Sequence, residues 1–418
     1  GKFVKNNLQK GARWMAELKY WLWLTTRKGL GPTGALAVLD HFSTPERAFY
    51  GEQEDFEALP LSPFARQSLL DKSLDQANQI LGDCDRLGIR IMTFQDAGYP
   101  QRLRQIAVPP AVLYIKGKTF RFDEEAAIGV VGMRKSSQVS QVRAQAFGME
   151  LAANGALVVS GIAEGIDCCA VRGALKGGGP VVSVLAGGAD VKFPYENRFL
   201  YDDVAAAGAL ISEYPPGTPH KGDHFPLRNR ILSGLCLGVL AVECEPRGGT
   251  MLTINHALEQ GREVYAVPVG LDEQCARGTN QLIRDFKARL VENAGDILRD
   301  YVDRFPTRLA KLAPLPPSVV SARLSGDKPR EAPAQKAREP ERPKRELVPR
   351  GQQKDRFTDD ELAILAAAAK SALTADEIVE RTQIPAKRVL SALTMLQVQG
   401  ALEERPGRRF FALVELEG

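Results

Sequence analysis

The chain has 418 residues, of which 44% are hydrophobic and 25% are charged. This composition is typical of a folded globular protein and excludes a wholly disordered chain. At this length, two or three domains are expected. The formal net charge is +4, but residues 324–356 contain ten Lys/Arg and six Asp/Glu and account for all of that excess. The overall charge therefore indicates nothing about nucleic-acid binding by the folded parts, for which only local clusters count.

Neither a membrane span nor a metal site is predicted. The most apolar stretch near the start of the sequence, Tyr20 to Leu24, is too short to cross a bilayer, and no signal-peptide pattern accompanies it. The six cysteines form no CxxC pair and no His/Cys cluster at metal-ligand spacing, which favours buried thiols in a reducing compartment. We therefore expect a cytoplasmic protein that carries no metal and no cofactor.

Residues 13–87 are predicted to form a small helical domain. Apolar residues recur there at helical spacing, and Gly29-Leu30-Gly31-Pro32 precedes the helical run Ala35 to Phe42. A turn of this kind before a short helix suits a helix-hairpin-helix or SAM-like bundle. Such a hairpin can hold a DNA phosphate on backbone N–H groups at a helix start. A purely structural helical domain is the alternative, since helix termini bind anions only when they are exposed.

Residues 88–303 alternate between strand-like and helix-like segments. This order predicts βαβ units with right-handed crossovers, and the expected fold is a Rossmann-like, doubly wound, mostly parallel α/β sheet. The predicted strands are Ala126–Val131, Ala156–Ser160, Val181–Ala186, Ala209–Ser212, Gly238–Glu243 and Glu263–Val267. The predicted helices are Gln138–Ala153, Ile166–Leu175, Asn197–Ala207, Asn229–Leu235 and Met251–Glu259.

The last part of the chain is predicted to be a linker followed by a winged helix. Residues 304–356 are rich in Pro, Lys, Arg and Glu and favour a disordered linker. Residues 357–418 show a helix start at Thr374, a second helix from Pro385 to Gln399, and a β-hairpin wing after it. This unit could bind duplex DNA or dock another protein. The cations available for phosphates are Lys387, Arg388, Arg405, Arg408 and Arg409.

Glycine-rich loops and arginines follow several of the predicted strands. In an open parallel sheet, ligands bind at the carboxyl ends of the strands, where loops meet helix N-termini. Glycine lets backbone N–H groups approach an anion, and the arginine fork suits phosphate. The recurrence of such turns on one sheet edge predicts a groove for a phosphate-bearing ligand. The turns are Gly132–Ser137, Ser160–Asp167, Gly187–Arg198, Arg228–Arg230 and Pro246–Thr250.

Nucleotide-binding and catalytic motifs of the common kinds are missing. No GxGxxG opens the first helix of the alternating region, and the chain has no GxxxxGK[ST], so neither dinucleotide binding nor P-loop chemistry is predicted. Of the four histidines, only His220 and His224 fall near a predicted loop site. A single acid such as Asp167, Asp190 or Glu243 near a strand end more often caps a helix or binds an arginine than acts as a base. We expect a binding protein with no catalytic residues.

Short motifs run in a characteristic order through residues 95 to 295. They are Tyr99-Pro100-Gln101-Arg102-Leu103, Pro109–Tyr114, Val130–Arg134, Ser160–Asp167, Ile211–Gly217 and, as the most specific, Phe225–Leu235. In order and spacing these motifs resemble the DNA-processing protein A (DprA/Smf) family, whose flanking helical and winged-helix domains also fit. The resemblance implies a protein of natural transformation and recombination that binds incoming single-stranded DNA, protects it and helps to load the RecA recombinase. It also implies a homodimer formed through the Rossmann-like domain.

The resemblance also implies individual binding residues. Arg134 falls on the family's phosphate-binding arginine, and the family uses a lysine near the third strand, for which Lys192 and Arg198 are both candidates. Taken with the loop residues, the predicted DNA- and phosphate-binding set is Arg134, Ser160, Gly161, Gly165, Lys192, Asn197, Arg198, Arg228, Asn229, Arg230, Arg247, Gly248 and Gly249.

Two positions depart from the family pattern. Val171 stands where a histidine is common, and Gly248 stands where a serine is usual. Loss of the histidine is expected to remove a polar group from the pocket. The glycine keeps the backbone cradle but lacks the hydroxyl donor.

Two other functions are compatible with the predicted folds. Nucleotide phosphoribohydrolases of the lysine-decarboxylase-like type share the fold and a Gly-Gly-rich turn, but in them a catalytic Glu follows closely, and residues Thr250 to Asn255 offer none. A winged-helix regulator would instead bind duplex DNA through residues 357–418.

Overall fold

The computed structural model describes residues 17–270, 277–309, 346–369, 371–405 and 409–417. The chain divides into two compact units, residues 1–314 and 315–418, which we describe separately. Within the described ranges, no helix has both the length and the apolar character that a membrane span requires.

The first unit begins with a group of short helices. Residues 17–25 are helical, and Gly31 enters the next helix with a φ of 60°, a left-handed conformation that glycine adopts without strain. Trp23, Val38 and Phe56 are fully or almost fully buried between these helices. The helices that follow are α2 (Gly31–Phe42), α3 (Pro45–Phe49), α4 (Gln53–Glu57), α5 (Pro63–Leu69) and α6 (Asp75–Leu87). The helical character of this region is confirmed; its assignment to a helix-hairpin-helix or SAM-like type stays a prediction.

A nine-stranded sheet follows, in the order β1-β2-β6-β5-β4-β3-β7-β8-β9. All neighbouring strands from β6 to β9 are parallel, whereas β1 and β2 run antiparallel to their neighbours. The strands are β1 (Ile89–Thr93), β2 (Val112–Gly117), β3 (Ala127–Val131), β4 (Leu157–Ser160), β5 (Val181–Leu185), β6 (Ala209–Ser212), β7 (Gly238–Ala241), β8 (Glu263–Ala266) and β9 (Arg289–Leu290).

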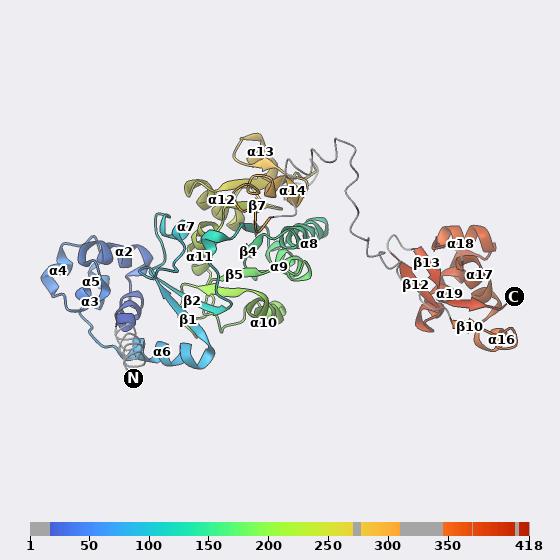
Figure 1. The fold of residues 1–418 in the computed structure, drawn as a ribbon, viewed down its shortest axis with the longest axis horizontal. Helices are drawn as coiled ribbons and strands as arrows, with labels where there is room; N and C mark the ends of the chain where they lie inside the picture. The colour runs from blue at the N-terminus through green and yellow to red at the C-terminus, as the bar shows by residue number, and fades with distance from the viewer. Residues whose placement is uncertain (1–16, 271–276, 310–345, 370, 406–408, 418) are drawn as a thin grey trace, which may run out of the picture. The chain divides into compact units, whose positions relative to one another are not determined.

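Helices cover both faces of this sheet (Figure 1). One apolar cluster joins the sheet to α6, α8 (Gln138–Ala153), α9 (Ile166–Lys176), α10 (Arg198–Ala207) and α14 (Ala294–Leu298). A second cluster on the other face joins it to α7 (Gln101–Arg104), α11 (His224–Leu235), α12 (Gly249–Glu259) and α13 (Arg277–Arg284). Two short 3-10 turns, η1 (Phe122–Glu124) and η2 (Tyr195–Asn197), lie between the longer elements. The predicted doubly wound, mostly parallel fold is confirmed.

The strand order creates a switch point beside β3. From β3 the chain adds β4, β5 and β6 on one side, and it then crosses over to add β7, β8 and β9 on the other. Between β3 and β7 the connecting loops turn away from each other, which leaves a crevice at the carboxyl ends of these strands. The six predicted strands match β3 to β8 within about two residues at each end, as sequence boundaries usually do.

The second unit has the winged-helix arrangement predicted for it. α17 (Asp359–Ala368), α18 (Ala375–Thr382) and α19 (Ala386–Val398) pack on a three-stranded sheet of order β11-β13-β12. Its strands are β11 (Leu373–Thr374), β12 (Leu402–Arg405) and β13 (Arg409–Ala412). Thr374 and Glu377 form a reciprocal capping box at the start of α18, as their spacing predicts.

This unit starts earlier in the chain than the predicted boundary at residue 357. β10 (Glu346–Val348) pairs in parallel with β14 (Val414–Leu416), and α16 (Gln353–Arg356) follows it. Val348 is 2% exposed and belongs to the apolar core of the unit. Residues 346–356 therefore differ from the disordered linker predicted over 304–356, because burial of Val348 offsets the polar composition around it. Residues 310–345 of that predicted linker lie outside the described residues.

Candidate functional site

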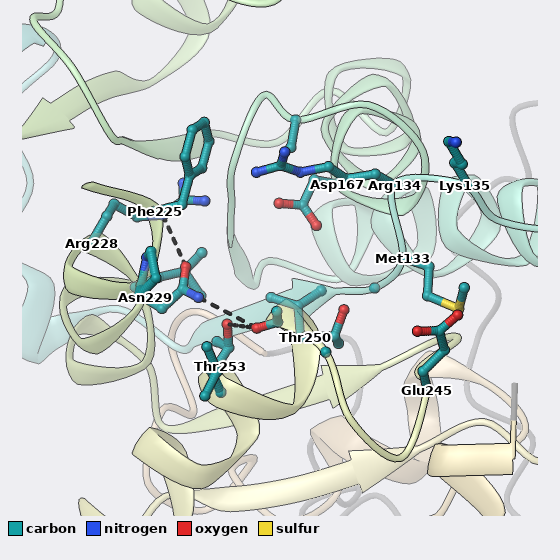
Figure 2. A pocket seen from close by; sticks show the side chains of 18 of the residues that line it. Met133, Arg134, Lys135, Asp167, Phe225, Arg228, Asn229, Glu245, Thr250 and Thr253 are labelled. Atoms are coloured by element: carbon teal, nitrogen blue, oxygen red, sulfur yellow. Dashed lines mark hydrogen bonds between the residues drawn. The ribbon is translucent and has the colours of Figure 1, made fainter. Parts of the chain in front are cut away.

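A cavity of about 440 Å³ lies at the switch point, beyond the carboxyl ends of β3, β4 and β7. Figure 2 shows side chains from four separate segments of the chain surrounding it. The lining residues are Val131–Lys135 after β3, Ala163 and Asp167 around the start of α9, Gly222, Phe225, Pro226, Arg228, Asn229 and Leu232 along α11, and Glu245, Gly248–Thr250, Leu252 and Thr253 around the start of α12.

Three helices begin at this cavity. α9 begins directly after Gly165, α11 begins at His224 and α12 begins at Gly249. Each contributes lining residues from its first turn. The N-terminal end of a helix carries unpaired N–H groups and a partial positive charge. Their convergence makes the cavity favourable for an anion.

The loop that carries Arg134 is held by hydrogen bonds to Glu243 and by close packing against Gly165. The buried Glu243 carboxylate accepts hydrogen bonds from the backbone N–H of Ser137 at 3.0 Å and from its hydroxyl at 3.0 Å. The N–H of Met133 donates to the Glu243 carbonyl at 3.0 Å. Gly165 packs against the same loop with a φ of 77°, where an added Cβ would lie 2.3 Å from the carbonyl oxygens of Met133 and Arg134. The backbone around Arg134 is therefore held in place, and Gly165 leaves the room for it.

Arg134 and Lys135 are the exposed cations of the cavity. The Arg134 guanidinium carbon lies 4.4 Å from the centre of the Phe225 ring, a cation–π arrangement. Neither side chain forms an ion pair with another residue that the structure describes. Both cations are therefore available to a ligand anion.

Arg228 is the buried cation of the cavity. It is 6% exposed, and its guanidinium donates to the Val184 carbonyl and, at 3.2 Å, to the Asn229 side-chain oxygen. The Asn229 amide in turn donates to the Gly249 carbonyl at 3.4 Å, as the dashed lines in Figure 2 show. These bonds orient Arg228 and tie the start of α12 to α11.

Asp167 places a carboxyl group beside these cations. It is 7% exposed and lines the cavity. Burial raises the pKa of Asp167 to about 6, while Arg228 and the N–H groups of Gly132 and Gly161 oppose that rise. Burial likewise lowers the pKa of Arg228, and Asp167 opposes that change.

A smaller cavity of about 70 Å³ adjoins the first. Arg134, Phe225 and Arg228 line both cavities. The smaller one adds aromatic side chains, among them Phe193 and His220, whose rings stack at a centroid distance of 5.4 Å. Burial lowers the pKa of His220. An apolar, ring-lined space therefore lies next to the cationic one.

The structure brings together five of the predicted binding residues. Arg134, Arg228, Asn229, Gly248 and Gly249 all line the larger cavity.

Three others lie immediately behind the cavity or apart from it. Gly161 lies behind it, with an added Cβ meeting both Asp167 and Arg228. Ser160 is fully buried and donates to the Val130 carbonyl at 2.6 Å, so it joins two strands. Arg230 makes a buried ion pair with Glu213 at 2.7 Å. The sequence places Arg230 next to Arg228 and Asn229, but helix α11 turns it to another side.

Four more predicted residues do not line either cavity. Asn197 is buried and bonds to Arg172 and to the Ile162 carbonyl. Lys192 pairs with Asp202 at 2.6 Å, and the Arg198 guanidinium carbon lies 4.0 Å from the centre of the Tyr195 ring. Arg247 is exposed in the turn between β7 and α12, next to the lining residues. Neither candidate for the family's lysine therefore lines the cavity.

The two departures from the family pattern have different structural consequences. Val171, a residue of α9, is fully buried in the apolar core and does not line the cavity, so the expected loss of a polar group from the pocket at this position is wrong. Gly248 does line the cavity.

The sequence analysis missed several lining residues, above all Phe225, Glu245 and Thr253; Lys135 falls in the predicted turn Gly132–Ser137 but was not in the predicted binding set. Phe225 opens the most specific motif of the family resemblance, and that position was the signal for it.

Comparison with known proteins agrees with this architecture. The family model described as DNA recombination-mediator protein A matches residues 90–302, and that of the DprA winged helix domain matches residues 332–408. The chain is 28% identical to Protein Smf of Synechocystis sp. over 420 residues, which is 94% of this chain and 98% of that protein. It is 37% identical to the DNA processing protein DprA of Bacillus subtilis over 217 residues, which is 52% of this chain and 73% of that protein. The X-ray structure of DNA processing protein A from Streptococcus pneumoniae matches with a TM-score of 0.57 and 28% identity, over 68% of this chain and 97% of that chain. The chain therefore belongs to the DprA/Smf family of DNA recombination-mediator proteins.

Proposed function

We propose that this protein binds single-stranded DNA and holds a backbone phosphate in the larger cavity. The observation that carries the proposal is the position of Arg134, an exposed arginine without an ion pair among the described residues, where three helices begin. A phosphodiester supplies the negative charge that such a site attracts. Arg134 and Lys135 contact the phosphate, while Arg228, Asn229 and the N–H groups of Gly248 and Gly249 form the floor.

The neighbouring aromatic residues favour a single strand over a duplex. Phe225 and Phe193 lie along the smaller cavity, and Phe193 is 46% exposed. In a duplex the bases are paired and stacked on each other, so their faces are not free to pack on protein rings. In a single strand each base offers a face to an aromatic side chain, and such stacking contributes about 1–3 kcal/mol per base.

We also propose that the protein acts by binding and not by catalysis. Of the two carboxylates at the larger cavity, Asp167 is buried beside Arg228 and accepts from two backbone N–H groups. Glu245 is exposed and precedes the glycine turn instead of following it. A protein that covers single-stranded DNA in this way protects it and presents it to the RecA recombinase. The free thiols among the described cysteines favour a reducing compartment, and we place this activity in the cytoplasm.

The edge strand β9 supports a homodimer formed through the sheet domain. β9 is the last strand of the sheet. Next to it Phe286 is 96% exposed and Leu290 is 46% exposed. An open edge with apolar side chains is a template for strand pairing with a second copy. We expect Leu290→Asp to convert the dimer to a monomer in sedimentation velocity, and Phe64→Ser, which changes an exposed apolar side chain in α5, to leave it dimeric.

The decisive experiment is a fluorescence-anisotropy titration of labelled oligothymidine and of labelled duplex. We expect the wild type to prefer the single strand and Arg134→Ala to lose at least about tenfold in affinity, as removal of a charged phosphate contact does. Arg121→Ala is the matched control, because Arg121 is an exposed arginine that precedes β3 and lies at the opposite end of that strand. Equal binding by Arg134→Ala and the wild type would remove the cavity from the binding site.

The same preparation tests the two alternatives. Release of free base from nucleoside monophosphates would establish the phosphoribohydrolase activity. Tight duplex binding that survives Arg134→Ala but disappears when residues 357–418 are deleted would move DNA binding to the winged helix.

A further inference from the structure

The exposed face of α19 carries apolar side chains where a DNA-reading helix needs polar ones. α19 is the second helix of the helix-turn-helix, which reads the major groove in winged helices that bind DNA. Leu390 is 58%, Met395 51% and Val398 79% exposed. Met395 and Val398 are three residues apart and adjoin on the helix surface, whereas Leu390 lies about 140° around the helix from Met395, with the exposed Thr394 between them.

Two of the cations of the unit are already engaged by acidic side chains. Arg388 makes a two-pronged ion pair with Asp360, with N–O distances of 2.8 and 2.7 Å. Arg409 lies 3.6 Å from Glu377 and donates to the Ala372 carbonyl. Residues 346–418 contain twelve Asp/Glu and ten Lys/Arg, an excess of two acids.

A groove of about 570 Å³ lies between α19, the start of α18 and the wing strands. Leu390 and Phe410 form its apolar part, and Asp376 and Glu404 supply carboxylates. Glu404 accepts a hydrogen bond from Gln397 of α19 at 3.3 Å. Neither Asp376 nor Glu404 forms an ion pair with any side chain that the structure describes. The groove therefore combines an apolar floor with two unpaired negative charges.

We propose that this groove docks a protein segment, namely an amphipathic helix with apolar side chains on one face and Lys/Arg beside them. The apolar side chains of such a helix cover Leu390 and Phe410 in the groove, as in other helix-in-groove complexes. Its cations meet Asp376 and Glu404, and this charge complementarity selects it over an acidic helix and over duplex DNA. The elements that form the groove are labelled in the C-terminal unit of Figure 1. The proposal is independent of the single-strand site in the first unit.

The test uses the full chain and two labelled model peptides of about 18 residues, one an amphipathic helix of Leu and Lys and the other of Leu and Glu. We expect the Leu/Lys peptide to bind at least about tenfold more tightly than the Leu/Glu peptide. The double variant Asp376→Lys/Glu404→Lys is expected to reverse that preference, and Leu390→Ser is expected to weaken binding of both peptides. Circular dichroism and unchanged oligothymidine affinity confirm that each variant is folded.

Matched controls lie in the same unit but outside the groove. Leu347→Ser removes an equally exposed leucine of β10, and Glu415→Lys reverses a charge on β14. We expect both to leave the peptide affinities unchanged. Equal binding of the two peptides, an unchanged preference in the Asp376→Lys/Glu404→Lys variant, or duplex binding that requires Leu390 would each overturn the proposal.

Discussion

Asp167 and Arg228 face each other across Gly161. A Cβ added at Gly161 would lie 2.7 Å from the Asp167 carboxylate oxygen Oδ2 and 2.8 Å from the Arg228 nitrogen Nη1. Both side chains are buried, and each shifts the other's pKa toward its charged form. Gly161 was predicted to bind phosphate. In the structure it leaves the space that the Asp167 carboxyl and the Arg228 guanidinium occupy. A ligand phosphate at the cavity would compete with Asp167 for the positive charge of Arg228.

Substitution of Gly161 is therefore expected to disturb both groups. In Gly161→Ala the methyl group would displace Asp167 or Arg228, and we expect oligothymidine affinity to fall by about tenfold. Gly222→Ala is the matched control, because Gly222 also lines the cavity and an added Cβ there meets no atom within 4 Å. Anisotropy titrations of both variants check this, and equal losses in the two would contradict it.

Binding is expected to strengthen as the pH falls. Burial raises the pKa of Asp167 to about 6, so its carboxyl is charged at about pH 8 and largely neutral at about pH 5. DNA phosphodiesters do not titrate in this range, and the cavity gains positive charge when Asp167 is protonated. In Asp167→Asn we expect oligothymidine to bind roughly fivefold more tightly at about pH 8, with a flatter pH profile. A profile in Asp167→Asn as steep as that of the wild type would assign the pH dependence to another group, such as His220 in the adjoining cavity.

The same group makes folding stability depend on pH. Because the folded-state pKa of Asp167 is raised above its usual value of 3.8, the folded state binds the proton more tightly than the unfolded state. The stabilising contribution is fully present below pH 3.8 and is lost as the pH rises through about 6. Urea denaturation of the wild type and of Asp167→Asn across that window measures this contribution. Other acids affect both proteins alike, so the difference between their free energies of unfolding should change with pH only through Asp167.

We expect Arg230 to contribute to folding stability and not to ligand binding. Its guanidinium and the Glu213 carboxylate are 8% and 13% exposed and are bonded at 2.7 and 2.9 Å. Removal of one partner leaves a buried charge unpaired, so Arg230→Ala should lower the free energy of unfolding by about 3 kcal/mol or more. Lys192→Ala breaks the exposed pair with Asp202 and should cost no more than about 1 kcal/mol. Urea denaturation measures both changes in the free energy of unfolding. A change near zero for Arg230→Ala would mean that Arg230 is free to contact the ligand.

The parallel strands of the sheet could be predicted from the sequence, but the two strands of its antiparallel edge could not. β3 is buried along its whole length, and buried strands of this kind appear as continuous apolar runs between turns. β1 has a mixed burial pattern, and residues 94–111, which include the short α7, connect it to β2, with which it pairs antiparallel from Ile89 to Thr93. Neither strand fits the alternation of strand and crossover helix on which the prediction relied, and so both were missed.

The individual contacts were harder to predict than the position of the site. Loops after parallel strands must meet at one sheet edge, so Arg134, Gly248 and Gly249 could be placed at the cavity from topology alone. Side-chain direction within a helix depends on packing that the sequence does not show. Arg228 lines the cavity whereas Arg230, two residues on along α11, turns to Glu213. The deviation of 346–356 from the predicted linker has a similar origin, because a single buried Val348 anchors a polar segment.

The salt dependence of binding should show directly whether Arg134 contacts a phosphate. For a single strand, the logarithm of the affinity falls with the logarithm of salt concentration by about 0.7 for each phosphate neutralised. Arg134→Ala should therefore lower the slope by about 0.7 as well as the affinity. Arg121→Ala should leave the slope unchanged. A flat salt response of the wild type would show that phosphate contacts do not dominate binding.

The glycine at position 248 offers a gain-of-function test. Gly248 precedes α12 with a φ of 174°, an extended conformation open to any residue, and the nearest atoms to an added Cβ belong to Glu245 at 3.7 and 3.9 Å. Gly248→Ser would place a hydroxyl at the cavity wall, where it can donate to a phosphate. One such hydrogen bond contributes about 1 kcal/mol, so we expect roughly fivefold tighter oligothymidine binding. Serine is also a favoured residue at a helix start, and a small gain in thermal stability should accompany it.

Gly248→Ala separates the hydroxyl from the added bulk. It places the same Cβ in the same space without a donor, so its oligothymidine affinity should match that of the wild type. Tighter binding by Gly248→Ser alone would place a phosphate within reach of residue 248 and fix one end of the strand path at the start of α12. Equal affinities for all three proteins would mean that the phosphate lies nearer Arg134 and Lys135, on the far wall of the cavity, and that Gly248 serves only the turn.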